Sequence, residues 1–293
     1  CWFESGSMPY AQQHYPFENK EHFEANFPAD FIAEGLDQTR GWFYTLVVLS
    51  AALFDKAAFK NVVVNGLVLA EDGQKMSKRK KNYPDPSHII ENYGADSLRL
   101  FLLGSSVVRG EDLRFSEPGI KDILRGVLIP LWSSYSFFVM YANLDKWNPP
   151  PVPSAPENPQ HPLDRWILSS LSEMVEEIDG AMAGYQLQQA ANRFEKFIDD
   201  LTNWYIRRSR RRFWKSQNDG DKDDAYRTLH YVLVTFCRTA APFIPFITEE
   251  IYRNLKGEGM PESVHLCDYP VPEKNRRDEY LEKQMAHTIR AVS

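Results

Sequence analysis

Two hydrophobic patterns divide this chain of 293 residues. In the first, apolar residues form short unbroken runs, of which residues 62–70 are the clearest example. Runs of β-branched and leucine residues without polar alternation are typical of parallel strands that are covered on both faces. In the second, beyond residue 118, apolar residues recur every three to four positions, as they do along amphipathic helices. The sequence therefore predicts an α/β region with a parallel sheet, followed by an all-α helical bundle.

A strand, a tight turn and a helix are predicted within the first 60 residues. The short strand, residues 27–35, ends at Glu34 and Gly35, and Asp37 is expected to cap the helix. The residues predicted on its inner face are Trp42, Phe43, Leu46, Leu49, Ser50, Leu53 and Phe54. Such a turn places Glu34, Asp37 and Gln38 at the carboxyl edge of the sheet, where short polar side chains can hold ribose hydroxyls or an ammonium group.

Turn residues and prolines set the boundaries of other segments. Residues 1–10 are rich in turn-forming residues and predict the end of a strand that enters a loop. Residues 84–102 predict a helix in which Asp96 and Arg99 act as a cap and a surface charge. A proline-induced kink is expected in a helix over residues 119–144.

The second half of the chain is predicted to be entirely helical apart from one connection. Amphipathic helices are predicted around residues 167–182, 190–205 and 229–240, and a last helix over residues 276–293. The proline-rich stretch 147–162 can be neither helix nor interior strand, so we expect an extended surface connection. Together the helices would form an antiparallel bundle.

Charge is distributed unevenly along the chain. The formal net charge is −6, yet basic residues concentrate around residue 78 and around residue 210. Local basic patches on an acidic background favour a shaped RNA partner over DNA or indiscriminate nucleic-acid binding. The candidate RNA-binding residues are Arg207, Arg208, Arg210, Arg211 and Arg212. Cations are also enriched at helix C-termini, so a purely structural role for this run stays open.

The sequence gives no indication of a metal site, a disulfide framework or a membrane segment. The three cysteines, Cys1, Cys237 and Cys267, lie far apart and form no C-x-x-C pair, which fits a reducing cytoplasm. A membrane segment needs roughly 20 uncharged residues to span a bilayer, and no apolar stretch of the chain is expected to reach that length. The chain does not begin with methionine, and we expect it to be a piece of a longer protein.

A strongly basic loop follows the apolar run at residues 62–70. Five basic side chains lie between Lys75 and Lys81, and Gly73 would let the backbone turn sharply. Repulsion among these cations is tolerable if a polyanion such as a triphosphate or a nucleic acid sits among them. The alternative is an ordinary solvated surface loop.

Residues 75–79 of this loop, Lys-Met-Ser-Lys-Arg, resemble the signature loop of the class I aminoacyl-tRNA synthetases, with arginine in fifth place where many members have serine. The resemblance implies that the loop closes over ATP. It implies that Lys78 stabilises charge on the transferring phosphates and that Lys75 assists. It also implies that Gly66 and Val68, on the strand before the loop, bind ATP.

A second block, residues 34–43, resembles the isoleucine branch of this family, with leucine at position 36 where serine is usual. The residues that would hold the aminoacyl-adenylate are Glu34, Gly35, Asp37 and Gln38. Trp2 and Trp42 would wall the pocket for the isoleucine side chain. Valine-specific members lack the Asp-Gln-Thr-Arg-Gly-Trp part of this block and leucine-specific members differ throughout, so these two branches are the disfavoured alternatives.

The resemblance covers nearly the whole chain and implies three parts. Residues 1–85 correspond to the second half of a Rossmann-type catalytic domain and residues 86–118 to a junction that contacts the tRNA stem. Residues 119–293 correspond to an anticodon-binding bundle, of which residues 203–207 resemble a family segment. A non-catalytic tRNA-binding module would need only the bundle and its arginines, and would leave the adenylate block and the lysine loop unexplained.

The implied reaction is attack of the isoleucine carboxylate on the α-phosphate of ATP, supplied with Mg²⁺ as MgATP, followed by acyl transfer to tRNA(Ile). Since the nucleophile is already an anion, positioning and charge stabilisation replace a general base. No protein-bound metal is expected. Isoleucine and valine differ by one methylene, and an apolar pocket discriminates only weakly between two ligands that differ so little. An editing domain is therefore expected elsewhere in the longer protein, which is expected to be a monomer. This chain alone is predicted to be inactive.

Overall fold

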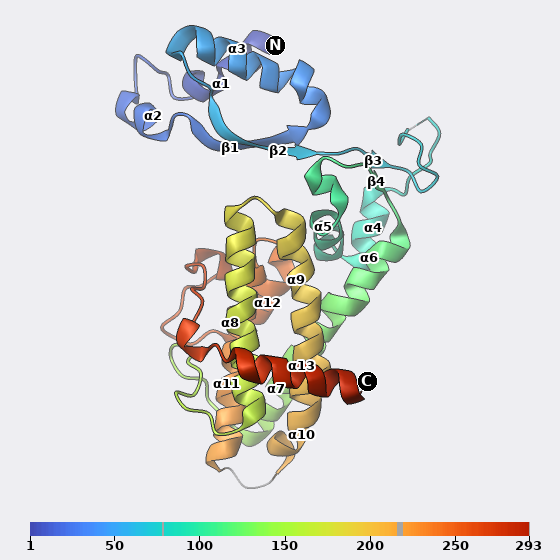
Figure 1. Ribbon diagram of the computed structural model, residues 1–293, viewed down its shortest axis with the longest axis vertical. Helices are drawn as coiled ribbons and strands as arrows, with labels where there is room; N and C mark the ends of the chain where they lie inside the picture. Colours follow the sequence, from blue (N-terminus) through green and yellow to red (C-terminus); the bar gives the residue numbers. More distant parts are fainter. Residues whose placement is uncertain (78, 216–218, 293) are drawn as a thin grey trace. The chain divides into compact units, whose positions relative to one another are not determined.

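The computed structural model describes residues 1–77, 79–215 and 219–292 (Figure 1). It divides into two compact units. The sheet unit comprises Cys1–Tyr83 and Ser105–Phe115, and the bundle unit comprises Pro84–Gly104 and Ser116–Ser293. The stretch predicted as a single junction, residues 86–118, therefore contributes to both units.

Two short parallel strand pairs form the sheet unit. The strands are β1 (Ala29–Gly35), β2 (Phe59–Asn65), β3 (Val68–Leu69) and β4 (Leu113–Arg114). β1 pairs in parallel with β2, with Gly35 opposite Asn65, and β3 pairs in parallel with β4. The parallel sheet predicted from the apolar runs is therefore confirmed.

Short helices complete the sheet unit. They are α1 (Trp2–Ala11), α2 (Lys20–Asn26), α3 (Trp42–Phe54) and the 3₁₀ turns Leu36–Arg40 and Ser106–Arg109. The prediction that residues 1–10 end a strand is wrong, because Gly6 serves packing and not a turn. α1 packs on α3, and a Cβ atom on Gly6 would lie only 2.8 Å from Cδ1 of Leu49 in α3.

Two further predictions for the sheet unit are wrong. Asp37 does not cap α3, because it lies in the preceding 3₁₀ turn and Gly41 stands at the N-cap. β2 is not covered on both faces, since the Val62 side chain is 40% exposed. Figure 1 shows α1 and α3 on the same side of the β1–β2 pair, so these two helices leave its other face uncovered. The small buried core consists of Ile32, Phe43, Leu46 and Ala58.

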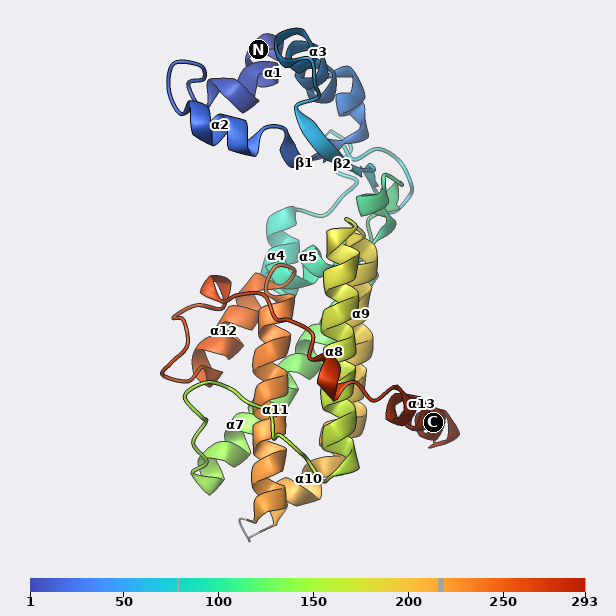
Figure 2. The same ribbon diagram turned by 60° about the vertical axis from the view of Figure 1, so that its left-hand side comes forward.

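Helices make up the bundle unit (Figure 2). They are α4 (Pro86–Tyr93), α5 (Ala95–Leu103), α6 (Glu117–Ile123), α7 (Ile129–Asp145), α8 (Pro162–Ala183), α9 (Leu187–Asp199), α10 (Arg207–Trp214), α11 (Gly220–Ala240), α12 (Pro245–Leu255), α13 (Glu279–Val292) and the 3₁₀ turns Val264–Leu266 and Lys274–Arg276. α8 packs on α9 and α11, which confirms the predicted helices of the second half. Residues 147–161 contain neither helix nor strand, also as predicted.

Two π-helical turns interrupt the bundle helices. The first, Leu124–Leu128, joins α6 to α7, and the second, Asp200–Ile206, joins α9 to α10. Pro130 follows the first π turn by two residues, inside the continuous helical run Glu117–Asp145. Proline has no amide hydrogen to donate, and both proline and π turns are causes of helix kinks, so the kink expected here stays a prediction.

The run Glu117–Asp145, which contains the first π turn, is long and apolar enough to cross a membrane by length and composition alone. This corrects the prediction that no such stretch exists, which overlooked that residues 126–144 carry no charge. Here Leu131 and Phe138 are buried in the bundle core. Core helices of globular proteins can share this composition, because they too are apolar on the buried side.

A buried ion pair lies within the bundle core. Asp164 is fully buried and accepts hydrogen bonds from both terminal nitrogens of Arg212, each at 2.7 Å. The Tyr205 hydroxyl donates a third hydrogen bond to Asp164, at 2.8 Å. Arg212 also pairs with Asp221 at 2.8 Å. The guanidinium group is thus bound to two carboxylates, an arrangement that offsets the cost of removing these charges from water.

Asp96 and Arg99 hold α5 against the connection between α11 and α12. Asp96 accepts hydrogen bonds from the backbone amides of Phe246, at 3.3 Å, and Ile247, at 2.7 Å. Arg99 donates to the Pro242 carbonyl oxygen at 2.9 Å. Arg99 is exposed, as predicted, but it also holds a backbone carbonyl, and Asp96 acts as a cap for a helix other than its own. Asp96 caps the first turn of α12, whose amides have no partner within that helix.

Candidate functional site

Several of the residues predicted to bind the adenylate lie at the carboxyl edge of the β1–β2 pair. Gly35 ends β1 opposite Asn65, the last residue of β2, and Gly66 follows directly. Glu34 precedes Gly35, and its side chain is exposed. Ligands of parallel sheets bind beyond this edge. The strand register therefore brings Gly66 close to Glu34 and Gly35, although it follows them by 31 or more positions along the chain.

Side-chain hydrogen bonds hold the 3₁₀ turn that follows β1. The Gln38 amide donates to Oδ2 of Asp37 at 3.1 Å and, through Oε1, accepts from the Trp42 backbone amide at 2.9 Å. A Cβ atom on Gly35 would lie 2.7 Å from Oδ1 of Asp37. The Asp37 carboxylate thus lies directly against the end of β1, beside the exposed Glu34.

The two tryptophans predicted to wall an amino-acid pocket lie beside the same turn. The Trp42 indole N–H donates to the Ser5 carbonyl oxygen at 3.0 Å, which ties α3 to α1. A Cβ atom on Gly41 would lie 3.3 Å from Cζ3 of Trp2. Trp2 is 61% exposed, so most of its ring is available to a ligand or to another protein segment.

A backbone contact that sequence reasoning missed fixes the strand before the lysine loop. A Cβ atom on Gly66 would lie 2.0 Å from the Glu111 carbonyl oxygen, so only glycine fits there. The Asp112 carboxylate accepts from the Leu67 backbone amide at 3.1 Å, and Val68 pairs with β4 in the register of the second sheet. No local pattern indicates these contacts, because Leu67 and Asp112 are 45 residues apart.

Turn hydrogen bonds order the part of the lysine loop that the structure describes. Gly73 has a φ of +78°, and the Asn82 side-chain oxygen accepts from the Ser77 amide at 2.9 Å. The Lys75 side chain is exposed, and its ammonium group has no hydrogen-bond or ion-pair partner among the described residues. Lys78, the residue predicted to act on the phosphates, lies outside the described residues.

In the bundle unit, the predicted RNA-binding run divides into exposed and buried members. The exposed arginines are Arg207, Arg208, Arg210 and Arg211. The Arg208 guanidinium carbon lies 4.8 Å from the centre of the Trp204 ring, in a cation–π contact. Arg212 is only 7% exposed and is bound to Asp164, so it is unavailable to an RNA phosphate at the surface. The inclusion of Arg212 in the predicted RNA-binding set is therefore corrected.

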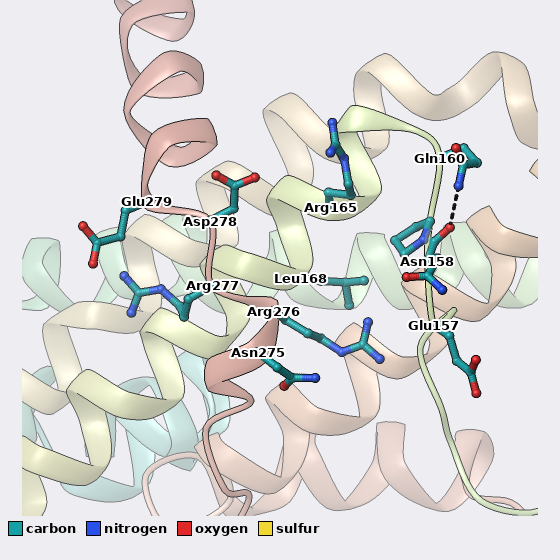
Figure 3. Close-up of a pocket in the computed structure, with 11 residues that line it drawn as sticks. Glu157, Asn158, Gln160, Arg165, Leu168, Asn275, Arg276, Arg277, Asp278 and Glu279 are labelled. Carbon is teal, nitrogen blue, oxygen red and sulfur yellow. Dashed lines mark hydrogen bonds between the residues drawn. The ribbon is translucent and has the colours of Figure 1, made fainter.

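A polar pocket of about 660 Å³ lies between the start of α8 and the segment that leads into α13 (Figure 3). Arg276 donates to the Pro156 carbonyl oxygen at 2.9 Å. Arg277 pairs with Glu176 at 3.1 Å and with Glu282 at 3.0 Å. These two cations are thus bound to groups of the protein, whereas Arg165, which also lines the pocket, is exposed and has no hydrogen-bond or ion-pair partner among the described residues.

No group of three or more His, Cys, Asp or Glu side chains within residues 1–77, 79–215 and 219–292 is arranged to hold a metal ion. The three cysteines are free thiols, one exposed, one buried and one half-buried.

Two family models match the chain. The model described as tRNA synthetases class I (I, L, M and V) matches residues 1–116. The model described as the anticodon-binding domain of tRNA ligase matches residues 164–293. Each match falls on the part of the chain where the corresponding motifs were found.

Two solved structures share the fold. The LeuRS–tRNA–LeuAMS ternary complex of Agrobacterium radiobacter K84 agnB2 aligns with a TM-score of 0.69 at 17% identity, covering 86% of this chain and 29% of that one. Methionyl-tRNA synthetase of Mycobacterium tuberculosis, bound by methionyl-adenylate, aligns with a TM-score of 0.64 at 20% identity, covering 82% of this chain and 46% of that one. At such identities the matches show the fold alone.

A curated relative gives the branch of the family. Isoleucine–tRNA ligase of Treponema denticola is 57% identical over 303 residues, a match that covers 100% of this chain and 28% of the relative. The chain thus spans less than a third of the length of this relative. With such identity from end to end, and with a synthetase model and an anticodon-binding model on its two parts, the chain belongs to the class I aminoacyl-tRNA synthetases, within their isoleucine–tRNA ligase branch.

Proposed function

We propose that this chain is part of a longer enzyme that activates isoleucine with ATP and transfers it to tRNA(Ile). One observation carries the proposal. The turn at residues 34–38 lies at the same sheet edge as the strand that leads from Gly66 into the lysine loop. The chain spans 28% of the relative from Treponema denticola, so the activity is assigned to the longer protein and not to this chain alone.

The sheet edge would hold the adenylate. The residues proposed to bind ATP and the aminoacyl-adenylate are Glu34, Gly35, Asp37, Gln38, Gly66, Val68 and Lys78. Glu34 and Asp37 supply carboxylates for an ammonium group or for ribose hydroxyls, since both are exposed beside the end of β1. Trp2 and Trp42 would face the apolar side chain of the amino acid.

Charge stabilisation is the chemical task of the lysine loop. The isoleucine carboxylate attacks the α-phosphate of MgATP, and pyrophosphate leaves as charge shifts onto its oxygens. Lys78 and Lys75 would stabilise this charge at the transition state, the kind of term that dominates phosphoryl and adenylyl transfer. Among the described residues nothing pairs with the exposed ammonium group of Lys75, which supports that role. MgATP is a substrate in this scheme, and no resident metal is required.

The exposed arginines of α10 would bind the tRNA backbone. Arg207, Arg208, Arg210 and Arg211 lie within five consecutive positions, and cations so placed attract phosphates in a salt-dependent way. The anticodon-binding model on residues 164–293 supports this assignment. A monomeric enzyme of the cytoplasm is the setting that we propose for both steps.

Amino-acid-dependent exchange of pyrophosphate into ATP, measured on the longer protein, tests the proposal. Isoleucine, valine and leucine are compared under the same conditions. We expect isoleucine to give the highest specificity constant. A preference for valine or leucine would contradict the assigned substrate but not the chemistry, whereas no exchange with any of the three would contradict both.

A further inference from the structure

The two π-helical turns of the bundle unit lie side by side. The turn Leu124–Leu128 packs against α9, and the turn Asp200–Ile206 packs against α7. A π turn widens a helix locally and redirects the side chains that follow it. Such turns are costly for regular packing and occur frequently at functional sites. Residues of both turns line one surface pocket.

A surface pocket of about 400 Å³ opens between these turns. Arg125 and Gly126 line it from the first turn, Asn203 from the second, and Asn192, Glu195 and Lys196 from α9. A Cβ atom on Gly126 would approach Oε1 of Glu195 to 3.2 Å, so the glycine leaves room in the wall of the pocket. Arg125, Glu195 and Lys196 are exposed.

Some polar groups of this pocket are bound within the protein and others are not, and Lys196 acts electrostatically on the nearby Asp200 carboxyl. Among the described residues, no hydrogen bond or ion pair engages the side chains of Arg125, Glu195 and Lys196. The Asn203 amide donates to Oδ1 of Asp199 at 2.5 Å, which fixes the orientation of Asn203 and leaves its side-chain oxygen without a donor there. The pocket thus presents cations, a carboxylate and an oriented amide to a ligand.

The mixed charge of the pocket selects among ligands. Carboxylates at Glu195 and Asp199 repel a phosphate group but accept hydrogen bonds from the amino and imino groups of a nucleobase. Asparagine amides can donate to and accept from base edges, and an arginine plane such as that of Arg125 can stack on a base. Unpaired RNA bases are recognised by this combination of groups.

The pocket lies close in sequence to the exposed arginines of α10. Asn203 precedes Arg207 by four residues in one helical run, a separation of about 6 Å along a helix. A strand of RNA whose phosphates lie along the exposed arginines of α10 would therefore pass the mouth of the pocket. Phosphate contacts position an RNA, and base contacts specify it.

We propose that the pocket between the two π turns binds one unpaired nucleotide of the RNA partner, with Glu195 and Asn203 contacting the base edge and Arg125 or Lys196 the flanking backbone. This inference rests on the proposed binding of tRNA by the bundle unit. It adds a specificity-determining contact to a face that otherwise offers only phosphate-binding arginines.

Binding of a tRNA(Ile) transcript to the chain of residues 1–293, followed by fluorescence anisotropy at several salt concentrations, tests the inference. Asn203→Ala removes a base contact, and Gly126→Val fills the pocket without removing a polar group. Both are expected to weaken binding about tenfold while the salt dependence stays unchanged. Arg210→Gln is the matched control, and it is expected to reduce the slope of log affinity against log salt by about one unit. Thermal unfolding of each variant checks that it is folded.

Chemical probing of the bound transcript provides the second readout. One unpaired nucleotide should be protected by the wild-type chain and by Arg210→Gln, and should become reactive with Asn203→Ala. If Asn203→Ala and Gly126→Val bind as tightly as the wild type and protect the same nucleotides, the pocket proposal is overturned while the RNA-binding function stands. If the wild-type chain binds no tRNA at physiological salt, the proposed RNA-binding function and the pocket both fail.

Discussion

The two units differ in how completely they bury their apolar residues. The bundle unit packs its helices around a continuous buried core, which extends from Leu100 in α5 to Val264 near α12. The buried cluster of the sheet unit is much smaller, with Ile32, Phe43, Leu46 and Ala58 as its members, while Trp2, Phe3 and Phe31 are each more than half exposed. Exposed apolar surface of this kind normally contacts another part of a protein. The two units therefore differ mainly in the size of the core that each one buries.

The largest effect is expected from breaking the buried ion pair of the bundle. Asp164→Ala leaves the buried Arg212 guanidinium with only the half-exposed Asp221 as partner. An uncompensated buried charge costs about 3–5 kcal/mol, so we expect a loss of that size in the free energy of unfolding, measured by urea denaturation. A double variant with leucine at position 164 and methionine at position 212 should recover most of the lost free energy of unfolding. A loss below about 1 kcal/mol in the single variant would show that the bundle core does not depend on the pair.

Truncating one fully buried leucine in each unit compares the two cores directly. Leu229 and Leu46 both have 0% exposure. Leu229→Ala should cost about 4 kcal/mol because helices surround the cavity, and Leu46→Ala about 2 kcal/mol because the small core of the sheet unit can relax around it. Hydrogen exchange followed separately in each unit measures both losses. Equal losses would argue against the difference in packing.

The stability of the bundle is expected to depend on pH because Asp200 is buried. Burial raises the pKa of this carboxyl to about 6, against the lowering influence of Lys196 and Arg193. Because its unfolded pKa is about 3.9, the folded state binds the extra proton, and stability from this residue falls as the pH rises from about 4 to 6. Asp200→Asn should therefore raise the free energy of unfolding by about 3 kcal/mol at pH 8 and by almost nothing below pH 4. Urea denaturation at the two pH values tests it, and an equal effect at both would contradict the assignment.

The smallest effect is expected at an exposed ion pair of the sheet unit. Lys60 and Asp30 lie 2.8 Å apart, with side chains 57% and 80% exposed. Surface pairs of this kind contribute little, so Asp30→Ala should change the free energy of unfolding by less than about 0.5 kcal/mol. The same urea titrations measure it. A loss as large as that of Asp164→Ala would mean that exposure to solvent does not explain why the two ion pairs differ in their contribution to stability.

Local pattern predicted most of the elements, although not the helix at Trp2–Ala11, and it did not predict their contacts. The apolar runs led to the parallel pair β1–β2, and three-to-four spacing led to the bundle helices. Gly6 was misread because its partner in α3 is about forty residues away, and a glycine in a packed helix looks the same as one in a turn. The contact of Gly66 with the Glu111 backbone was missed for the same reason.

The arginine run shows most clearly what local sequence pattern cannot predict. Arg211 and Arg212 are adjacent and chemically identical, yet Arg211 is exposed and Arg212 is bound to Asp164, 48 residues earlier. Only the packing of α8 against the helical run that ends in α10 separates them. The candidate site residues at the sheet edge were easier to place together, because parallel strands that follow one another bring their carboxyl ends to one edge.

The central claim is that the sheet unit carries the adenylate chemistry and the bundle unit carries the RNA contacts. One measurement on the longer protein tests it: isoleucine-dependent pyrophosphate exchange and tRNA charging, compared between Lys78→Ala and the fourfold variant with glutamine at Arg207, Arg208, Arg210 and Arg211. The account predicts that Lys78→Ala loses exchange and charging together, and that the fourfold variant keeps exchange and loses charging. Exchange that survives Lys78→Ala, or collapses in the fourfold variant, would contradict it.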